Sequence, residues 1–90
     1  MDEFYLDCRS VEEKSDICKG FAHFLSVPEW YCSNLDAIFD CLGDVFSAKT
    51  IHLTHTAALE ERLGRDYADR LFSMLSRAAA ENPFIELIMD

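Results

Sequence analysis

The stretch that decides the fold of this chain covers residues 27–44 and reads Val27-Pro28-Glu29-Trp30-Tyr31-Cys32-Ser33-Asn34-Leu35-Asp36-Ala37-Ile38-Phe39-Asp40-Cys41-Leu42-Gly43-Asp44. Pro28 restricts Val27 to extended backbone and stops any preceding helix, so the stretch begins as an aromatic loop. Asn34 is a good N-cap, because its side-chain oxygen can accept a free backbone N–H of the first helical turn. Gly43 is a stop signal. The sequence therefore predicts a helix that begins after Asn34 and ends near Gly43.

The predicted helix has an apolar face and an acidic face. At about 100° per residue, the apolar side chains that share one arc and must face the core are Leu35, Ile38, Leu42 and Val45. The opposite side carries Asp36, Asp40 and Asp44, and Phe39 lies on the border. Like charges at i,i+4 destabilise a helix by roughly 0.2–0.5 kcal/mol per pair. The stripe is either a solvated face or a surface kept acidic for a basic partner, and the neighbouring Trp30 and Tyr31 favour the second interpretation.

Length, composition and charge limit the class of protein. Half of the 90 residues are hydrophobic, so residues 1–90 are expected to form one globular domain. No apolar run approaches the ~20 residues of a membrane span, and the start of the chain lacks a secretory signal, so we expect a cytoplasmic protein. The net charge of −9 argues against binding nucleic acid or an anionic membrane. It suits capture of a basic protein, because opposite fields raise association rates.

The cysteines predict free thiols. The chain has four of them, at Cys8, Cys18, Cys32 and Cys41. No C-x-x-C spacing occurs, and without an export signal we expect a reducing cytoplasm and no disulfide framework. We expect Cys41 at the edge of the helix core face and Cys32, in the aromatic loop, to be exposed.

Outside residues 27–44, the apolar pattern predicts three strands and three further helices. The strands are expected at residues 4–6, 50–54 and 84–89. The last is apolar at nearly every position, as in a strand covered on both faces. The helices are expected at residues 16–26, 56–63 and 66–81, with a polar connection over residues 7–14. Strands separated by helices indicate βαβ units. The sequence therefore predicts an α/β fold with a three-stranded parallel sheet packed with about four helices, in the order β-α-α-β-α-α-β.

Residues 25–42 resemble the barstar family, intracellular inhibitors of the ribonuclease barnase. The family pattern is an apolar residue, Pro-Glu, two aromatics, two variable residues, and then Asn-Leu-Asp-Ala-aliphatic-aromatic-Asp-Cys-Leu. Here it runs from Val27-Pro28-Glu29 to Asp40-Cys41-Leu42. Outside this stretch the chain resembles the family in pattern only. The resemblance implies a three-stranded parallel sheet with four helices, in agreement with the apolar pattern.

The resemblance also implies a function and a surface. In barstar-like inhibitors the loop and the helix cover the ribonuclease active site, and two helical aspartates meet the residues that would otherwise bind RNA phosphates. Carried over, these are Asp36 and Asp40. The predicted ribonuclease-binding surface further includes Trp30, Tyr31, Asn34, Leu35, Phe39 and Asp44. The expected partner is a basic ribonuclease of the barnase type or a related toxin, bound 1:1 by a monomer without enzymatic activity or cofactor.

Two positions depart from the family pattern. The family's type protein has an acidic contact in its last helix where this chain has Arg77, and Cys32 replaces a loop glycine. If the loop needs a positive φ at that point, a cysteine there is strained. Arg77 favours the alternative that the same fold serves as an immunity or binding protein for a different toxin or partner.

Catalysis and metal binding are weaker interpretations. Asp36 and Asp40 could be an acid and base pair, but exposed helical aspartates keep a low pKa, which is unsuited to general acid work. His23, His52 and His55 lack the clustered ligand spacing of structural zinc. We therefore expect no catalytic residue and no metal site.

Overall fold

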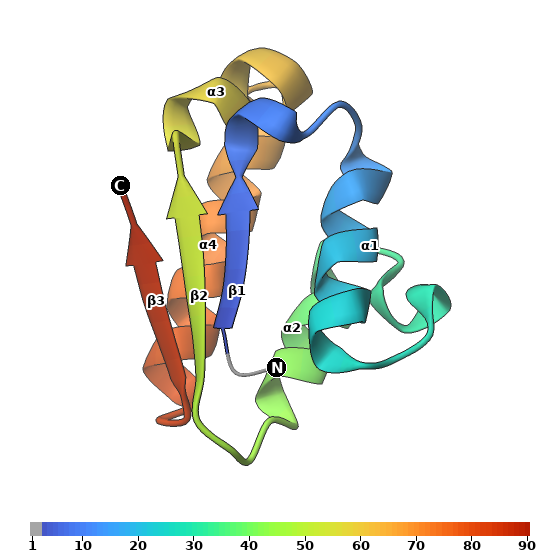
Figure 1. The fold of residues 1–90 in the computed structure, drawn as a ribbon, viewed down its shortest axis with the longest axis vertical. Helices are drawn as coiled ribbons and strands as arrows, with labels where there is room; N and C mark the ends of the chain where they lie inside the picture. Colours follow the sequence, from blue (N-terminus) through green and yellow to red (C-terminus); the bar gives the residue numbers. More distant parts are fainter. Residues whose placement is uncertain (1–2) are drawn as a thin grey trace.

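The computed structural model of the chain describes residues 3–90. One sheet contains three parallel strands in the order β1-β2-β3, namely β1 (Glu3–Asp7), β2 (Lys49–Thr54) and β3 (Ile85–Met89). The α-helices of this part of the chain are α1 (Lys14–Leu25), α2 (Leu35–Gly43), α3 (Thr56–Leu63) and α4 (Arg65–Glu81). Short 3-10 turns form η1 (Cys8–Ser10) and η2 (Glu29–Cys32). The predicted α/β fold and its element order are confirmed (Figure 1).

The helices cover one face of the sheet. Figure 1 shows α4 crossing behind the strands, while the face toward the viewer is open. Alternate residues therefore divide between core and solvent: Ile51 and Leu53 of β2 are buried, and Tyr5 is 66% exposed. The prediction that strand 84–89 is covered on both faces is wrong. β3 lies at the edge of the sheet, and Ile88, opposite His52 in the register, is 45% exposed on the open face.

The connection between β1 and α1 contributes to the core as well. The sequence predicts a polar connection over residues 7–14, but Cys8 and Val11 are buried there. The first helix begins before its predicted start, because the Asp16 carboxylate accepts the backbone N–H groups of Glu12 and Glu13 at 2.9 and 3.1 Å. These bonds satisfy donors that a helix start otherwise leaves free.

The end of α1 sets the direction of the aromatic loop. Ser26 adopts a left-handed conformation with φ 57°, and the N–H of Val27 donates to the carbonyl of Ala22 at 3.0 Å. This closes the last turn and sends the chain into Pro28, which precedes η2. The loop is therefore held at both ends, by α1 before it and by α2 after it.

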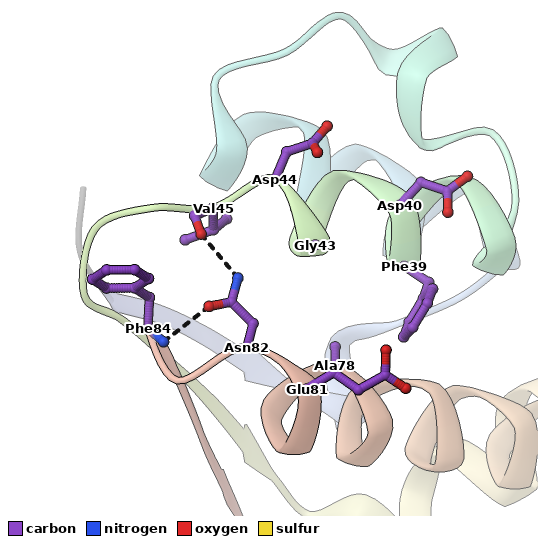
Figure 2. Close-up of a pocket in the computed structure, with 9 residues that line it drawn as sticks. All are labelled: Phe39, Asp40, Gly43, Asp44, Val45, Ala78, Glu81, Asn82 and Phe84. Carbon is purple, nitrogen blue, oxygen red and sulfur yellow. Dashed lines mark hydrogen bonds between the residues drawn. The ribbon is translucent and has the colours of Figure 1, made fainter.

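A buried asparagine joins the end of α2 to the turn before β3. The Nδ2 of Asn82 donates to the carbonyls of Leu42 and Val45, each at 2.9 Å, and its Oδ1 accepts the N–H of Phe84 at 2.9 Å (Figure 2). Asn82 is the buried polar residue of residues 3–90, at 8% exposure. Because α2 packs against α4, these bonds fix where α2 ends relative to the last helix.

Candidate functional site

Helix α2 presents the predicted acidic side chains to solvent. Asp36 and Asp40 are exposed, whereas Ile38 and Leu42 on the opposite side are fully buried. Oδ1 of Asn34 accepts the N–H of Ala37 at 2.7 Å, so the predicted N-cap is confirmed. The two carboxylates therefore stand one turn apart on a helix whose other face is anchored in the core.

The other predicted residues on or next to α2 differ in their exposure. Leu35 and Phe39 are half-buried, and Asn34 is exposed although its side chain caps the helix. The helix ends at Gly43, so Asp44 is its C-cap and lies exposed at the negative end of the helix dipole. Asp44 is thus placed beside Asp40 but outside the regular helix.

The aromatic loop forms a stacked pair on the surface. Trp30 is 69% exposed and Tyr31 is 47% exposed, with ring centroids 4.2 Å apart. Below them, Cys41 Sγ of α2 donates to the carbonyl of Tyr31 at 3.5 Å. The loop is therefore tied to the helix that carries the aspartates.

The prediction that Cys32 is exposed is wrong. The loop turns as a 3-10 helix, which directs its last residue inward, and Cys32 is fully buried. Positive φ angles at non-glycine residues occur within residues 3–90 at Ser26 and His55, so Cys32 carries no such strain. Burial, and then the neighbouring Cys41, raise the pKa of the Cys32 thiol to about 11. This cysteine is a packing residue in the support of the loop.

The side chain of Phe39, on α2, points toward α4 and lines two hollows that lie between these helices. The guanidinium carbon of Arg77 sits 4.6 Å from the centroid of the Phe39 ring, in cation–π geometry. Arg77 Nε also lies 3.3 Å from Glu81 Oε2. Arg77, one of the two positions at which the chain departs from the family pattern, therefore lies inside the candidate surface.

The hollow on one side of Phe39 has three acidic residues among its lining residues, and we name it the acidic pocket. It measures about 410 Å³ and is lined by Phe39, Asp40, Gly43, Asp44, Val45, Ala78, Glu81, Asn82 and Phe84. Figure 2 shows Asp40 on α2, Asp44 at the C-cap of that helix and Glu81 on α4. The carboxylates of Asp40 and Asp44 point away from α4, whereas the side chain of Glu81 extends toward Phe39. None of its lining residues is a Lys or Arg. The charge around this pocket favours a basic side chain at its rim.

The hollow on the other side of Phe39 has the opposite character, and we name it the cationic groove. It measures about 550 Å³ and is lined by Lys14, Cys18, Ser33, Asn34, Leu35, Asp36, Phe39, Tyr67, Arg70, Ser73, Met74 and Arg77. Lys14 Nζ lies 5.0 Å from the centroid of the Tyr67 ring. The positive end of the α2 dipole, at Leu35, adds to the charge of these cations.

The sequence marked Arg77 as a departure from the family pattern. It did not indicate that Lys14, Arg70 or Glu81 belongs to the site. The available signal was the i,i+4 spacing of Arg77 and Glu81, which marks an exposed, ion-paired face of α4. That spacing does not reveal which other helix lies beside the face. Packing of α4 against α2 brings Arg70, Arg77 and Glu81 to the site, and Lys14 comes from the start of α1.

None of the three histidines lines either hollow, and His52 lies on the open face of the sheet. His52 Nε2 is 2.9 Å from Glu3 Oε1, and its ring stacks on Tyr5 on the open face of the sheet. Within the described part of the chain, no group of three or more His, Cys, Asp or Glu side chains is placed to hold a metal ion. No helix among residues 3–90 has both the length and the apolar character needed to cross a membrane.

Comparison with known proteins gives a family match that covers most of the chain. A family model described as Barstar (barnase inhibitor) matches residues 1–87. A search of curated proteins finds no match. The matched range includes the aromatic loop, α2 and α4, and so covers the loop, both hollows and the seam between them.

Proposed function

The chain belongs to the barstar family, whose description is that of a barnase inhibitor, and from this premise we propose that it inhibits a small basic ribonuclease by covering its active site. The observation that carries the proposal is the pair of exposed carboxylates, Asp36 and Asp40, on one face of an anchored helix. The stacked rings of Trp30 and Tyr31 lie next to them along the chain.

The mechanism is imitation of the substrate's charges. A ribonuclease must hold phosphate groups, so its active site is basic. Carboxylates at i and i+4 on a helix stand about 5–6 Å apart at their Cβ atoms and can take the places of phosphate anions. Arginines in the enzyme can clamp each carboxylate with two hydrogen bonds, and lysine or histidine adds charge-assisted bonds. The inhibitor needs no chemistry of its own.

The surface is held in shape before the partner arrives. The Asn34 cap fixes the start of α2, the bond from Cys41 to Tyr31 fixes the loop, and Asn82 fixes the end of α2. Little conformational freedom is therefore lost on binding, which favours a tight complex. The acidic pocket offers an adjoining place for a basic side chain of the enzyme.

The direct test is inhibition of barnase, measured at low and at high salt. Steering between the −9 chain and a basic enzyme weakens as salt screens the charges, so association should be slower at high salt. Asp40→Ala removes a carboxylate that would accept charge-assisted bonds, and we expect an affinity loss of about 10- to 100-fold. Asp44→Ala should cost less, because Asp44 lies at the helix end.

Asp69→Ala is the matched control, because Asp69 is exposed on α4, lines neither hollow and carries the same charge. It should leave inhibition nearly unchanged. Equal losses for Asp40→Ala and Asp44→Ala would contradict the ranking. No inhibition at either salt concentration would reject barnase as a target and leave the fold standing.

A second candidate function keeps the fold and changes the target. Arg77, at a position where the family's type protein is acidic, favours an immunity or binding protein for a different toxin or partner. In either case we propose a cytoplasmic monomer that binds its target 1:1, with no cofactor. A neighbouring gene for a small secreted nuclease or for a toxin C-terminal domain would support inhibition of a nuclease.

A further inference from the structure

We propose that the target of this chain presents an acidic side chain to the cationic groove, so that ion pairs of both polarities hold the complex together. Arg77 and Arg70 would then select targets that carry this acid and reject enzymes that are basic at the same place. The inference rests on the proposed function, because it concerns the same surface, and it adds a requirement that the target must meet.

The charge of the surface reverses across Phe39. On one side the acidic pocket has three carboxylates among its lining residues, Asp40, Asp44 and Glu81, and no Lys or Arg. On the other side the cationic groove has Lys14, Arg70 and Arg77 against the single carboxylate of Asp36. In a chain with 17 acidic and 8 basic residues, three cations around one groove stand out from the general charge.

The two arginines are positioned and still available. Arg77 lies over the Phe39 ring and pairs through Nε with Glu81, yet its side chain is 70% exposed. Arg70 pairs through Nη2 with Asp66 at 3.2 Å and is 71% exposed. A guanidinium has five N–H donors, so each retains donors for a further acceptor. Their internal contacts limit the rotamers available to them, which suits bidentate capture of a carboxylate.

A carboxylate side chain of a protein fits this groove better than other anions. RNA or another polyanion would meet the overall charge of −9 before it reached the groove. A uniformly basic protein face would meet like charges at Lys14, Arg70 and Arg77, and like charges across an interface oppose binding. The partner that satisfies both hollows is therefore basic where it meets Asp40 and acidic where it meets Arg77.

The test uses barnase and a set of barnase variants in which surface residues are replaced by glutamate one at a time. Their affinities are measured by biolayer interferometry for the wild-type chain, Arg77→Glu and Arg70→Glu. At least one glutamate should tighten binding to the wild-type chain by about tenfold, the gain typical of a charge-assisted hydrogen bond. Arg77→Glu or Arg70→Glu should abolish that gain.

Two controls separate charge from structure. Arg62→Glu makes the same charge change on α3, which lies at the opposite end of the molecule from α2 in Figure 1, and it should retain the gain. Arg70→Glu leaves the contact between Arg77 and the Phe39 ring in place. If this variant loses the gain in affinity, the loss therefore cannot come from movement of that ring. Circular dichroism checks that each variant is folded.

The outcomes distinguish this inference from the function on which it rests. If barnase binds but no glutamate tightens the complex, or the gain survives both Arg77→Glu and Arg70→Glu, the acidic contact is refuted and inhibition stands. If no barnase variant binds any form of the chain, the proposed barnase-type target is refuted, and the inference falls with it.

Discussion

Replacing Asn82 by alanine should be among the most costly changes to a polar side chain in this protein. The side chain is 8% exposed and takes part in three hydrogen bonds of 2.9 Å, to the carbonyls of Leu42 and Val45 and from the N–H of Phe84 (Figure 2). These bonds join the end of α2 to the turn that leads into β3. Alanine would remove all of them and leave a small void.

The magnitude follows from the number of bonds. A hydrogen bond contributes about 1 kcal/mol net, so three give about 3 kcal/mol. The carbonyl of Leu42 still accepts the N–H of Val45 at 3.2 Å, whereas the carbonyl of Val45 loses the bond from Asn82. We therefore expect a loss of about 2–4 kcal/mol in the free energy of unfolding. For a domain of this size, 3 kcal/mol lowers Tm by about 12–24 °C.

Urea and thermal unfolding followed by circular dichroism measure this loss. Asn34→Ala is the comparison, because it removes one exposed cap bond and should cost about 1 kcal/mol. Asn82→Asp keeps the acceptor for the Phe84 N–H and loses both donors, so it should also destabilise strongly. If Asn82→Ala costs no more than Asn34→Ala, the reasoning from the bonds of Asn82 is wrong.

Three further results are expected. Hydrogen bonds from the side chain and the backbone of Arg9 lower the pKa of Asp7 to about 2. The ionised carboxylate therefore stabilises the fold at pH values above the unfolded pKa of about 4. This contribution is lost as the pH falls toward 2. Asp7→Asn should make the free energy of unfolding in urea depend less on pH between about pH 4 and pH 2. An unchanged pH dependence in this variant would contradict the assigned role of Asp7. Iodoacetamide should label the half-buried Cys18 before the buried Cys32, because burial raises the pKa of the Cys32 thiol to about 11. Equal labelling rates, measured by peptide mass spectrometry, would contradict this order. Acrylamide should quench the single tryptophan, Trp30, in the free chain and much less in a barnase complex, and equal quenching would place the loop outside the interface.

The local sequence pattern was sufficient to predict most of the fold. The alternation of apolar residues in β2, the spacing of Ile38 and Leu42 in α2 and the N-cap at Asn34 all act between residues close in sequence, and each was predicted correctly. The start of α1 was predicted less well, because Asp16 bonds backward to Glu12 and Glu13 and extends the helix. Position along the helix wheel also correctly placed the aspartates of α2 in solvent.

Two errors came from elements whose environment is set at long range. The apolar sequence of β3 indicated burial on both faces, but no helix of residues 3–90 covers the outer face, and Ile88 is exposed there. The position of Cys32 in the aromatic loop indicated exposure, but the loop turns as a 3-10 helix and Cys32 is fully buried. In both cases the missing information was which other segment lies against the residue.

The sequence by itself determined that this is a βαβ-type chain with an acidic helix beside an aromatic loop, because periodicity, caps and family pattern are read along the chain. Only the tertiary structure decided the charge of the surface around that helix. α4 is distant in sequence, yet its packing against α2 adds Glu81 to one side of Phe39 and Arg70 and Arg77 to the other. The electrostatic character of a pocket is a sum over all elements that line it, and that sum exists only once those elements have packed.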